Sequence, residues 1–379
     1  FKFMKNVLFI APTTYQLPLT ENLKKKFITL SEVCNVSVLA FANSKTFLNE
    51  TYGNFYLNKK IKNRLINYFR IIQISIFTTH KIIKKENIDI VCFQDPVSSF
   101  FSILFLKVRR AEVKIVVETH GDFIETLSLE KNLVLPRLYK KLFYIMAKYS
   151  IGKSNIIRAV SSSTEQQVLD IDSSKSVVRF PAWIDFKDFQ NIEPKPLSKD
   201  KFNILFIGSV TDRKKPHMII EAIQRINDKS YHLSIVGPAP NEKYFKELKD
   251  LIDKSDLQNQ VSLIGPVDRE SVKDYYSTSN LMILPSISEG LARVIFESQV
   301  AMCPVLVTDA PGMSDIVIDG QTGYVFESNN LDSLSLKIEY IKNNYDEASL
   351  VAKNAKGFIL SNYSEDNFKF SFKKLFDTV

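Results

Sequence analysis

Short continuous runs of Val, Ile and Leu alternate with amphipathic stretches along almost the whole chain, and this alternation restricts the fold more than any other feature. Strands buried on both faces of a parallel sheet have this composition. Two series of such runs, each interleaved with helical patterns, predict two doubly wound α/β domains in a chain of 379 residues. The expected strands are Asn6–Ala11, Asn35–Phe41, Ile88–Phe93, Val113–Glu118, Ile156–Val160 and Val177–Phe180, then Asn203–Ile207, His232–Val236, Val261–Ile264, Leu281–Leu284 and Val305–Thr308.

A change of composition marks the boundary between the two domains. The segment Gln190–Asp200 contains two prolines and almost no apolar residues, which is typical of a linker. We therefore expect a first domain over residues 1–189, a linker over 190–200 and a second domain over 201–361. The aromatic helical pattern at 362–379 needs a surface to bury against, and we expect it to pack back on the first domain.

The net charge of +8 is unevenly divided between the two halves. Residues 1–190 hold 28 Lys and Arg against 16 Asp and Glu, and the remainder holds 22 against 26. This asymmetry favours an anionic partner for the first half, such as a membrane surface, a phosphorylated lipid or a nucleic acid. Asn58–Lys85 and Pro136–Lys153 combine basic and apolar residues, as interfacial helices do. An ordinary core-facing helix with a solvated basic side accounts for either stretch equally well, but the balance of the whole half favours a membrane surface.

The cysteines and the hydropathy bear on location. Cys34, Cys92 and Cys303 are widely spaced in apolar segments, which predicts reduced, buried thiols and argues against a zinc site. No apolar run reaches the roughly eighteen residues of a membrane span, and no secretory signal is expected. We expect a cytoplasmic protein, held peripherally on the inner face of the cell membrane if its basic half binds lipid.

The densest functional signal runs from Leu281 to Pro304, LMILPSISEGLARVIFESQVAMCP. A buried strand is expected to end at Pro285, and a helix is expected from Ala292 to about Met302. Ligands of open α/β sheets bind at the carboxyl ends of the strands, and free N–H groups at a helix start bind anions. A diphosphate is therefore expected over Leu291–Val294.

Two carboxylates flank this segment, Glu289 in the loop and Glu297 in the helix. A carboxylate accepts two hydroxyl hydrogens at once, which suits a ribose diol or a pair of sugar hydroxyls. The pair therefore predicts contacts to two parts of one elongated ligand.

The segment resembles the E-x7-E motif of glycosyltransferase family 4, whose members are retaining enzymes of the GT-B fold. The resemblance implies two Rossmann-like doubly wound domains that face each other across a cleft. It also implies that Glu297 holds the ribose hydroxyls of a nucleotide-sugar donor and that Glu289 contacts the transferred sugar. The donor-binding set implied in this way is Gly208, Arg213, Lys214, Val267, Glu289, Gly290, Leu291, Ala292, Arg293, Val294 and Glu297.

Two further segments match the family. Gly208–Ala222 resembles its G-R-x5-K-G region, which makes Lys214 the residue that neutralises the diphosphate. Ser209 replaces the usual Arg, and Arg213 is a candidate substitute. His120, at the end of an expected strand, resembles the histidine that contacts the donor sugar near the reacting carbon, so the expected catalytic residues are His120, Lys214 and Glu289.

The resemblance implies that a sugar passes from a UDP-sugar or a GDP-mannose-type donor to a hydroxyl of a glycan or lipid-linked acceptor, with retention, in cell-envelope polysaccharide or glycolipid synthesis. The basic phosphate site leads us to expect no metal and no other cofactor. Three alternatives remain open. They are a sugar-nucleotide epimerase of the same fold, a non-catalytic GT-B partner subunit, which Ser209 and Ala292 would suit, and a nucleic-acid-binding protein, for which no recognition motif is seen.

Overall fold

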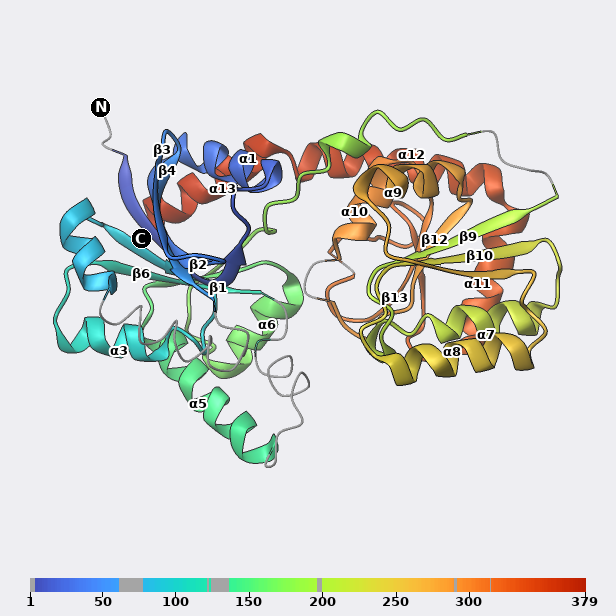
Figure 1. The fold of residues 1–379 in the computed structure, drawn as a ribbon, viewed down its shortest axis with the longest axis horizontal. Helices are drawn as coiled ribbons and strands as arrows, with labels where there is room; N and C mark the ends of the chain where they lie inside the picture. The colour runs from blue at the N-terminus through green and yellow to red at the C-terminus, as the bar shows by residue number, and fades with distance from the viewer. Residues whose placement is uncertain are drawn as a thin grey trace. The chain divides into compact units, whose positions relative to one another are not determined.

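The computed structural model describes residues 4–60, 78–120, 123, 136–195, 200–289, 292–313 and 315–379. The chain divides into two compact units (Figure 1). Unit 1 comprises Phe1–Trp183 and Glu365–Val379, and unit 2 comprises Ile184–Ser364. Among the described residues, no helix is both long and apolar enough to cross a bilayer.

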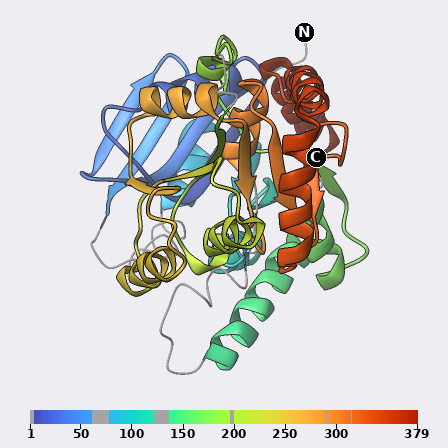
Figure 2. The same cartoon turned by 90° about the vertical axis from the view of Figure 1, so that its right-hand side faces the viewer.

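Unit 1 is built on an eight-stranded sheet with the order β3-β4-β2-β1-β5-β6-β7-β8. All described neighbours pair in parallel except β3 and β4, which form an antiparallel hairpin at one edge, drawn in blue in Figure 2. The strands are β1 (Lys5–Tyr15), β2 (Cys34–Ala42), β3 (Thr46–Glu50), β4 (Gly53–Lys59), β5 (Ile90–Phe93), β6 (Lys114–Thr119), β7 (Ile156–Ala159) and β8 (Val177–Arg179).

Helices cover both faces of this sheet, because successive side chains of a strand point to opposite faces. On β1, Val7 and Phe9 pack toward α1 (Glu21–Ser31) and α13 (Glu365–Thr378). Leu8 and Ile10 pack toward the opposite layer. That layer contains α3 (Phe100–Val108), α5 (Pro136–Lys153) and α6 (Ser162–Ile171), drawn below the sheet in Figure 1. The continuous apolar runs of the sequence are thus strands buried on both sides.

Unit 2 has a six-stranded parallel sheet with the order β11-β10-β9-β12-β13-β14. The strands are β9 (Phe202–Ile207), β10 (Tyr231–Val236), β11 (Val261–Gly265), β12 (Leu281–Leu284), β13 (Val305–Thr308) and β14 (Tyr324–Phe326). The helices are α7 (His217–Ile226), α8 (Glu242–Lys254), α9 (Arg269–Thr278), α10 (Arg293–Val300), α11 (Leu331–Asn343) and α12 (Tyr345–Asn362), with short 3-10 turns η1 (Lys187–Phe189) and η2 (Asp212–Lys214). In Figure 1, α9, α10 and α12 lie on one side of the sheet and α7 and α8 on the other.

The C-terminal helix α13 lies in unit 1, where Phe368, Phe372, Leu375 and Phe376 are buried in the core. The ring of Phe372 contacts Phe9 and Phe180, at centroid distances of 6.1 and 5.0 Å. The aromatic pattern of this segment therefore buries against the first sheet, and the preceding helix α12 stays with unit 2.

The division between the units falls earlier than the sequence predicts. Residues 184–189 were expected in the first domain but lie in unit 2, because Phe186 and Phe189 are buried in its core. The described part of the expected linker also contacts unit 2. Ile192 packs against that core, and the Lys195 amide donates to the Ser277 carbonyl. Strands β3, β4 and β14 were not predicted.

Candidate active site

The predicted donor residues gather at the carboxyl ends of β9 and β12, which are neighbours in the unit 2 sheet. From β9 the chain builds outward through β10 and β11, and then returns to place β12 on the other side of β9. Ligands of such sheets bind beside the two loops that leave this switch point. Here the loops are joined, since the Ile287 amide donates to the Arg213 carbonyl at 3.0 Å.

Charged side chains from both loops converge on Glu289. Its Oε1 atom lies 2.8 Å from Lys214 Nζ and 3.2 Å from Arg213 Nη1. The same oxygen accepts a hydrogen bond from Ser286 Oγ at 3.0 Å, and Arg213 also donates to the Ser288 carbonyl. Two cations therefore meet one carboxylate. The side chains of Glu289 and Lys214 are only 9% and 13% exposed, whereas that of Arg213 is 42% exposed, so the cluster has a net positive charge whose second cation faces solvent.

Two glycines allow this convergence. Gly312 has a φ of +90°, and a Cβ on it would stand 1.9 Å from the carbonyl oxygen of Glu289. Only glycine fits such an approach. The Glu289 amide donates to the Pro311 carbonyl at 3.3 Å, so the loop after β13 fixes the backbone of Glu289. Gly208, with a φ of +142°, ends β9 beside the Lys214 side chain.

Helix α10 starts immediately after this loop. It runs over Arg293–Val300, so it starts one residue later and ends two residues earlier than predicted, with the buried Ala292 as its N-cap. Ala292 has no side chain that can satisfy the first N–H groups, and the helix dipole makes this end positive. Arg293 is exposed and Val294 is partly buried. Gly290 and Leu291, also predicted to contact the donor, lie outside the described residues.

Glu297 lies on α10 and is partly buried. Its Oε2 atom accepts a hydrogen bond from Tyr276 on α9 at 3.2 Å. Burial raises the pKa of Glu297 above its ordinary value, against the opposing effects of Arg269 and the Tyr276 hydroxyl. Sequence reasoning missed Tyr276. Its buried position on α9 is known only from the structure.

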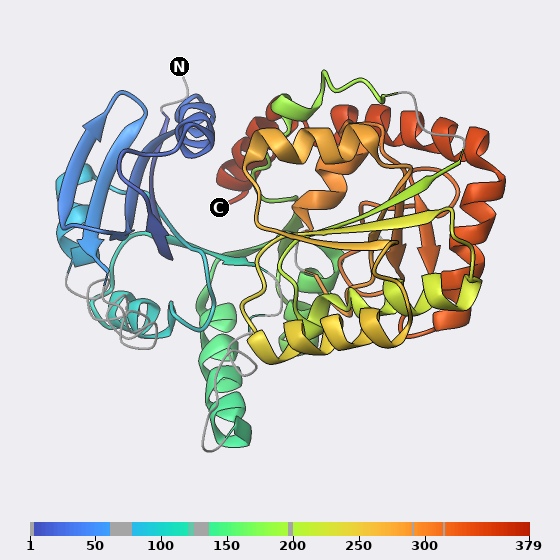
Figure 3. The ribbon, with the colours of Figure 1, turned by 45° about the vertical axis from the view of Figure 1, so that its right-hand side comes forward.

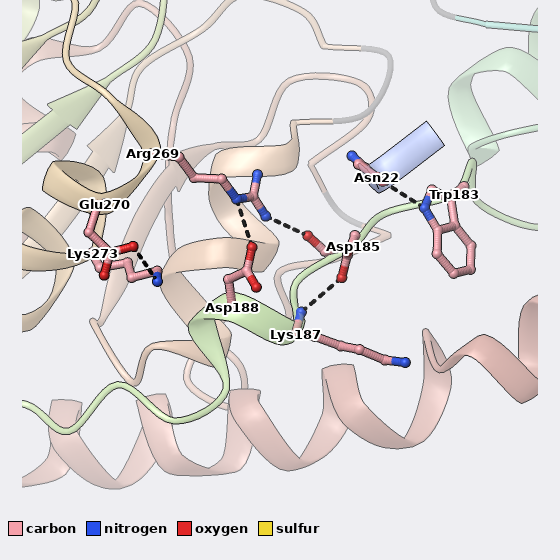
Figure 4. Close-up of polar contacts among 8 residues, drawn as sticks. All are labelled: Asn22, Trp183, Asp185, Lys187, Asp188, Arg269, Glu270 and Lys273. Atoms are coloured by element: carbon pink, nitrogen blue, oxygen red, sulfur yellow. Dashed lines mark hydrogen bonds and ion pairs between the residues drawn. The ribbon is translucent and has the colours of Figure 1, made fainter. Parts of the chain in front are cut away.

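A chain of contacts supports Tyr276 from the start of unit 2. Its ring lies 5.7 Å from that of Phe189, edge to face. Arg269 stacks over Phe189 at 4.9 Å and donates to Asp188 Oδ2 and to the Asp185 carbonyl, both at 3.0 Å (Figure 4). Residues 185–189 are thereby fixed to α9.

The remaining predicted residues, Val267 and His120, belong to different units. Val267 follows β11 and packs partly buried against the unit 2 core. His120 follows β6 in unit 1, and its Nε2 atom lies 3.0 Å from Glu118 Oε2. Glu118 is fully buried and pairs with Arg158, and sequence reasoning missed both residues. A charged residue inside each of two apolar runs, VVET and IIRA, was the available signal.

In the described parts of the chain, no three His, Cys, Asp or Glu side chains are grouped so that they could hold a metal ion. The triplet Asp170-Ile171-Asp172 has the Asp-x-Asp spacing of many metal sites but lies in unit 1, at the end of α6. Asp170 accepts from Gln166, and Asp172 accepts from Ser174.

Two Rossmann-like units in one chain, each built on a largely parallel sheet, are the architecture of the GT-B fold. The HepE protein of Anabaena, solved in complex with UDP, superposes with a TM-score of 0.71 and 14% identity over 99% of this chain and 100% of its own. At this identity the likeness shows the fold alone.

Two family models cover most of the chain. Residues 188–358 match "Glycosyl transferases group 1", and residues 30–186 match "Glycosyltransferase Family 4". These matches support membership of the GT-B glycosyltransferase group 1 family.

Curated relatives match shorter stretches. An uncharacterized glycosyltransferase of Methanocaldococcus jannaschii is 29% identical over 154 residues, which are 41% of this chain and 42% of that protein. The capsular polysaccharide biosynthesis glycosyltransferase CapM of Staphylococcus aureus is 25% identical over 240 residues, 59% of this chain and 61% of that protein. The chain thus spans about half the length of the curated relatives it matches.

Proposed function

We propose that this protein transfers a sugar from a nucleotide-diphosphate sugar to a hydroxyl of a glycan or lipid-linked acceptor, with retention, in the synthesis of an envelope polysaccharide or glycolipid. The observation that carries the proposal is the convergence of Lys214 and Arg213 on Glu289 beside the start of α10. CapM, named for capsular polysaccharide biosynthesis, and HepE, solved with UDP, support the reaction class and the donor class.

In this proposal each charged group has a stated task. Lys214, Arg213 and the N–H groups of α10 stabilise the charge that develops on the departing diphosphate. Glu289 and Glu297 accept hydroxyl hydrogens of the sugar and of the ribose, and His120 contacts the sugar near the reacting carbon. The leaving phosphate oxygen takes the acceptor proton on the face where the new bond forms. No metal or other cofactor takes part in this scheme.

In this scheme, donor binding also rearranges the contacts of Glu289. In this structure its carboxylate contacts both cations that would bind the diphosphate in this scheme. Donor binding therefore exchanges the contacts from Lys214 and Arg213 to Glu289 for contacts to phosphate, which releases the carboxylate toward the sugar.

Incubation with a panel of UDP- and GDP-sugars, with and without EDTA, tests the reaction class. We expect slow hydrolysis of one donor, unaffected by EDTA, and release of its nucleoside diphosphate. An epimerised sugar nucleotide would instead identify an epimerase. Absence of both turnover and binding for every donor would leave the non-catalytic partner subunit as the better description.

We further propose that α5 of unit 1 binds an anionic membrane surface. Phe143, Met146, Ala147 and Ile151 bury one face of this helix in the core. A second apolar stripe is left outside, with Leu138, Leu142 and Ile145 exposed by 61%, 48% and 52%. Met146, on the same helix, is therefore a core residue. Figure 3 shows α5 (green) extending from the rest of its unit.

Basic residues adjoin the exposed stripe of α5. Arg137, Lys140, Lys141 and Tyr144 line an open hollow of about 410 Å³. Apolar residues beside cations suit the interface of an anionic leaflet. Of the other basic stretch, Asn58–Lys85, residues 61–77 lie outside the described residues.

Vesicle flotation tests this surface. We expect the protein to float with phosphatidylglycerol vesicles at low salt and not with phosphatidylcholine vesicles. Lys140→Ala/Lys141→Ala should cost about 1 kcal/mol for each charge, roughly a thirtyfold loss of partitioning for the pair. Leu142→Ser should also weaken flotation, whereas Leu336→Ser, 66% exposed on α11 of unit 2, should leave it unchanged. Equal flotation of all variants would remove the α5 assignment.

A further inference from the structure

A buried ion pair lies in unit 1, whereas the donor-site cluster belongs to unit 2. Glu118 on β6 and Arg158 on β7 occupy paired register positions on neighbouring parallel strands. Arg158 Nη1 lies 2.9 Å from Glu118 Oε2, and the two residues are 2% and 0% exposed. Both side chains lie on the sheet face that packs against α13.

Other contacts hold Arg158 in place. Its guanidinium stacks over the rings of Phe180 and Phe372, at 4.2 and 4.9 Å, and its Nη2 donates to the Pro181 carbonyl at 2.7 Å. Glu118 Oε1 and Arg158 Nε have no hydrogen-bond partner among the described residues. A buried ion pair with unused polar atoms stabilises a fold less than apolar residues of similar size would. The pair therefore calls for a role other than stability.

The neighbouring group is His120. Its Nε2 atom lies 3.0 Å from Glu118 Oε2, the same oxygen that pairs with Arg158. The His120 side chain is 37% exposed, so the ring links the buried pair to the surface at the carboxyl end of β6. Burial by itself raises the pKa of Glu118, but the charge of Arg158 and the hydrogen bond to His120 outweigh burial and bring it to about 2. Glu118 is thus ionised at neutral pH.

An ionised carboxylate only accepts hydrogen bonds. His120 must therefore carry its proton on Nε2, and in the neutral ring this leaves Nδ1 as the acceptor atom.

We propose that Glu118, fixed by Arg158, is a positioning residue that holds His120 in one ring orientation and in the Nε2–H tautomer. The neutral imidazole then offers Nδ1 as the acceptor for a hydroxyl of the donor sugar. This role rests on the proposed function, in which His120 contacts that sugar. The Nε2–H tautomer of His120 does not depend on the proposed function.

The test is a two-bond ¹H–¹⁵N correlation spectrum of donor-free protein labelled with ¹⁵N-histidine. The chain has four histidines, and His120→Gln assigns the signal. We expect the Nε2–H pattern for the neutral ring of His120. In Glu118→Gln, whose amide can donate as well as accept, we expect a mixture of tautomers. An Nδ1–H pattern in the unmodified protein would overturn the proposal, and this result is available even if Glu118→Gln does not fold.

Kinetic measurements separate the positioning role of Glu118 from the proposed function of the protein. For a folded Glu118→Gln we expect kcat to fall at least tenfold, with the KM for the donor changed less than threefold. An unchanged kcat together with a changed tautomer would overturn the positioning role. If no donor is turned over by the unmodified protein, the proposed function fails while the spectrum still decides how His120 is held.

Discussion

We expect the replacement of Arg158 with methionine to lower the free energy of unfolding of unit 1 by about 3–5 kcal/mol, the usual cost of leaving a buried charge without its partner. Glu118 is fully buried, and Arg158 supplies its counter-charge at 2.9 Å. Methionine keeps much of the contact with Phe180 and Phe372 but provides no charge. Urea unfolding followed by tryptophan fluorescence measures the change, because Trp183, the only tryptophan in the sequence, packs on Phe368 of unit 1 and donates to Asn22 (Figure 4).

Two companion variants make the result specific. Arg179→Ala removes a surface arginine from the same unit, paired with Glu165 at 3.2 Å, and should cost no more than about 1 kcal/mol. Glu118→Leu/Arg158→Met removes both buried charges and should recover most of the lost stability. If the double variant is as unstable as Arg158→Met, packing and not charge explains the loss.

The same pair predicts a dependence on pH. The pKa of Glu118 falls from an ordinary value of 4.5 to about 2 in the folded protein. The stabilisation from its ionised form is therefore complete above pH 4.5 and is lost as the pH falls toward 2. The difference in stability between the unmodified protein and Arg158→Met should shrink over that range.

We expect the replacement of Lys214 or Glu297 with alanine to reduce the rate of donor turnover at least tenfold, about 1–3 kcal/mol for the loss of a charged contact. For Lys214→Ala the loss should appear in the binding of the free nucleoside diphosphate, because in the proposed function the removed ammonium contacts phosphate. For Glu297→Ala the loss should depend on the ribose hydroxyls, so a 2′,3′-dideoxy nucleotide should bind the variant and the unmodified protein alike. Calorimetry of nucleotide binding and donor turnover measure the two effects.

Lys215→Ala is the matched control for Lys214→Ala. It makes the same change of charge one residue further along, where the Lys215 ammonium instead contacts Asn329 Oδ1 at 2.5 Å.

Glu289→Gln separates the two proposed tasks of the cluster, which are diphosphate binding by Lys214 and Arg213 and the sugar contact by Glu289. It releases Lys214 and Arg213 from their carboxylate, so nucleoside diphosphate binding should hold or tighten while sugar transfer falls. If both Lys214→Ala and Glu297→Ala turned over the donor as fast as the unmodified protein, the site assignment would be contradicted.

The fold was largely predictable because most of its strands are buried on both faces and appear as continuous apolar runs. Strands β3 and β4 escaped prediction because they form an edge hairpin. Thr46–Glu50 has no buried residue, and only Phe55 and Leu57 of Gly53–Lys59 are buried. Strand β14 has three residues, too few for a recognisable period. The boundary at 183 and 184 was missed because residues 184–189 join unit 2 through core contacts that composition does not reveal.

The sequence by itself determined the strand–loop–helix segment around Glu289 and Glu297. Alternation along the expected strand Val113–Glu118 also determined that Val116 and Glu118 point to one face of the sheet. Only the tertiary structure decided that Glu289 holds both Lys214 and Arg213, and that Arg158 is the partner of Glu118. Alternation is a property of each strand alone. Register between parallel strands is set by the packing of the whole sheet, which brings residues 40 positions apart into contact.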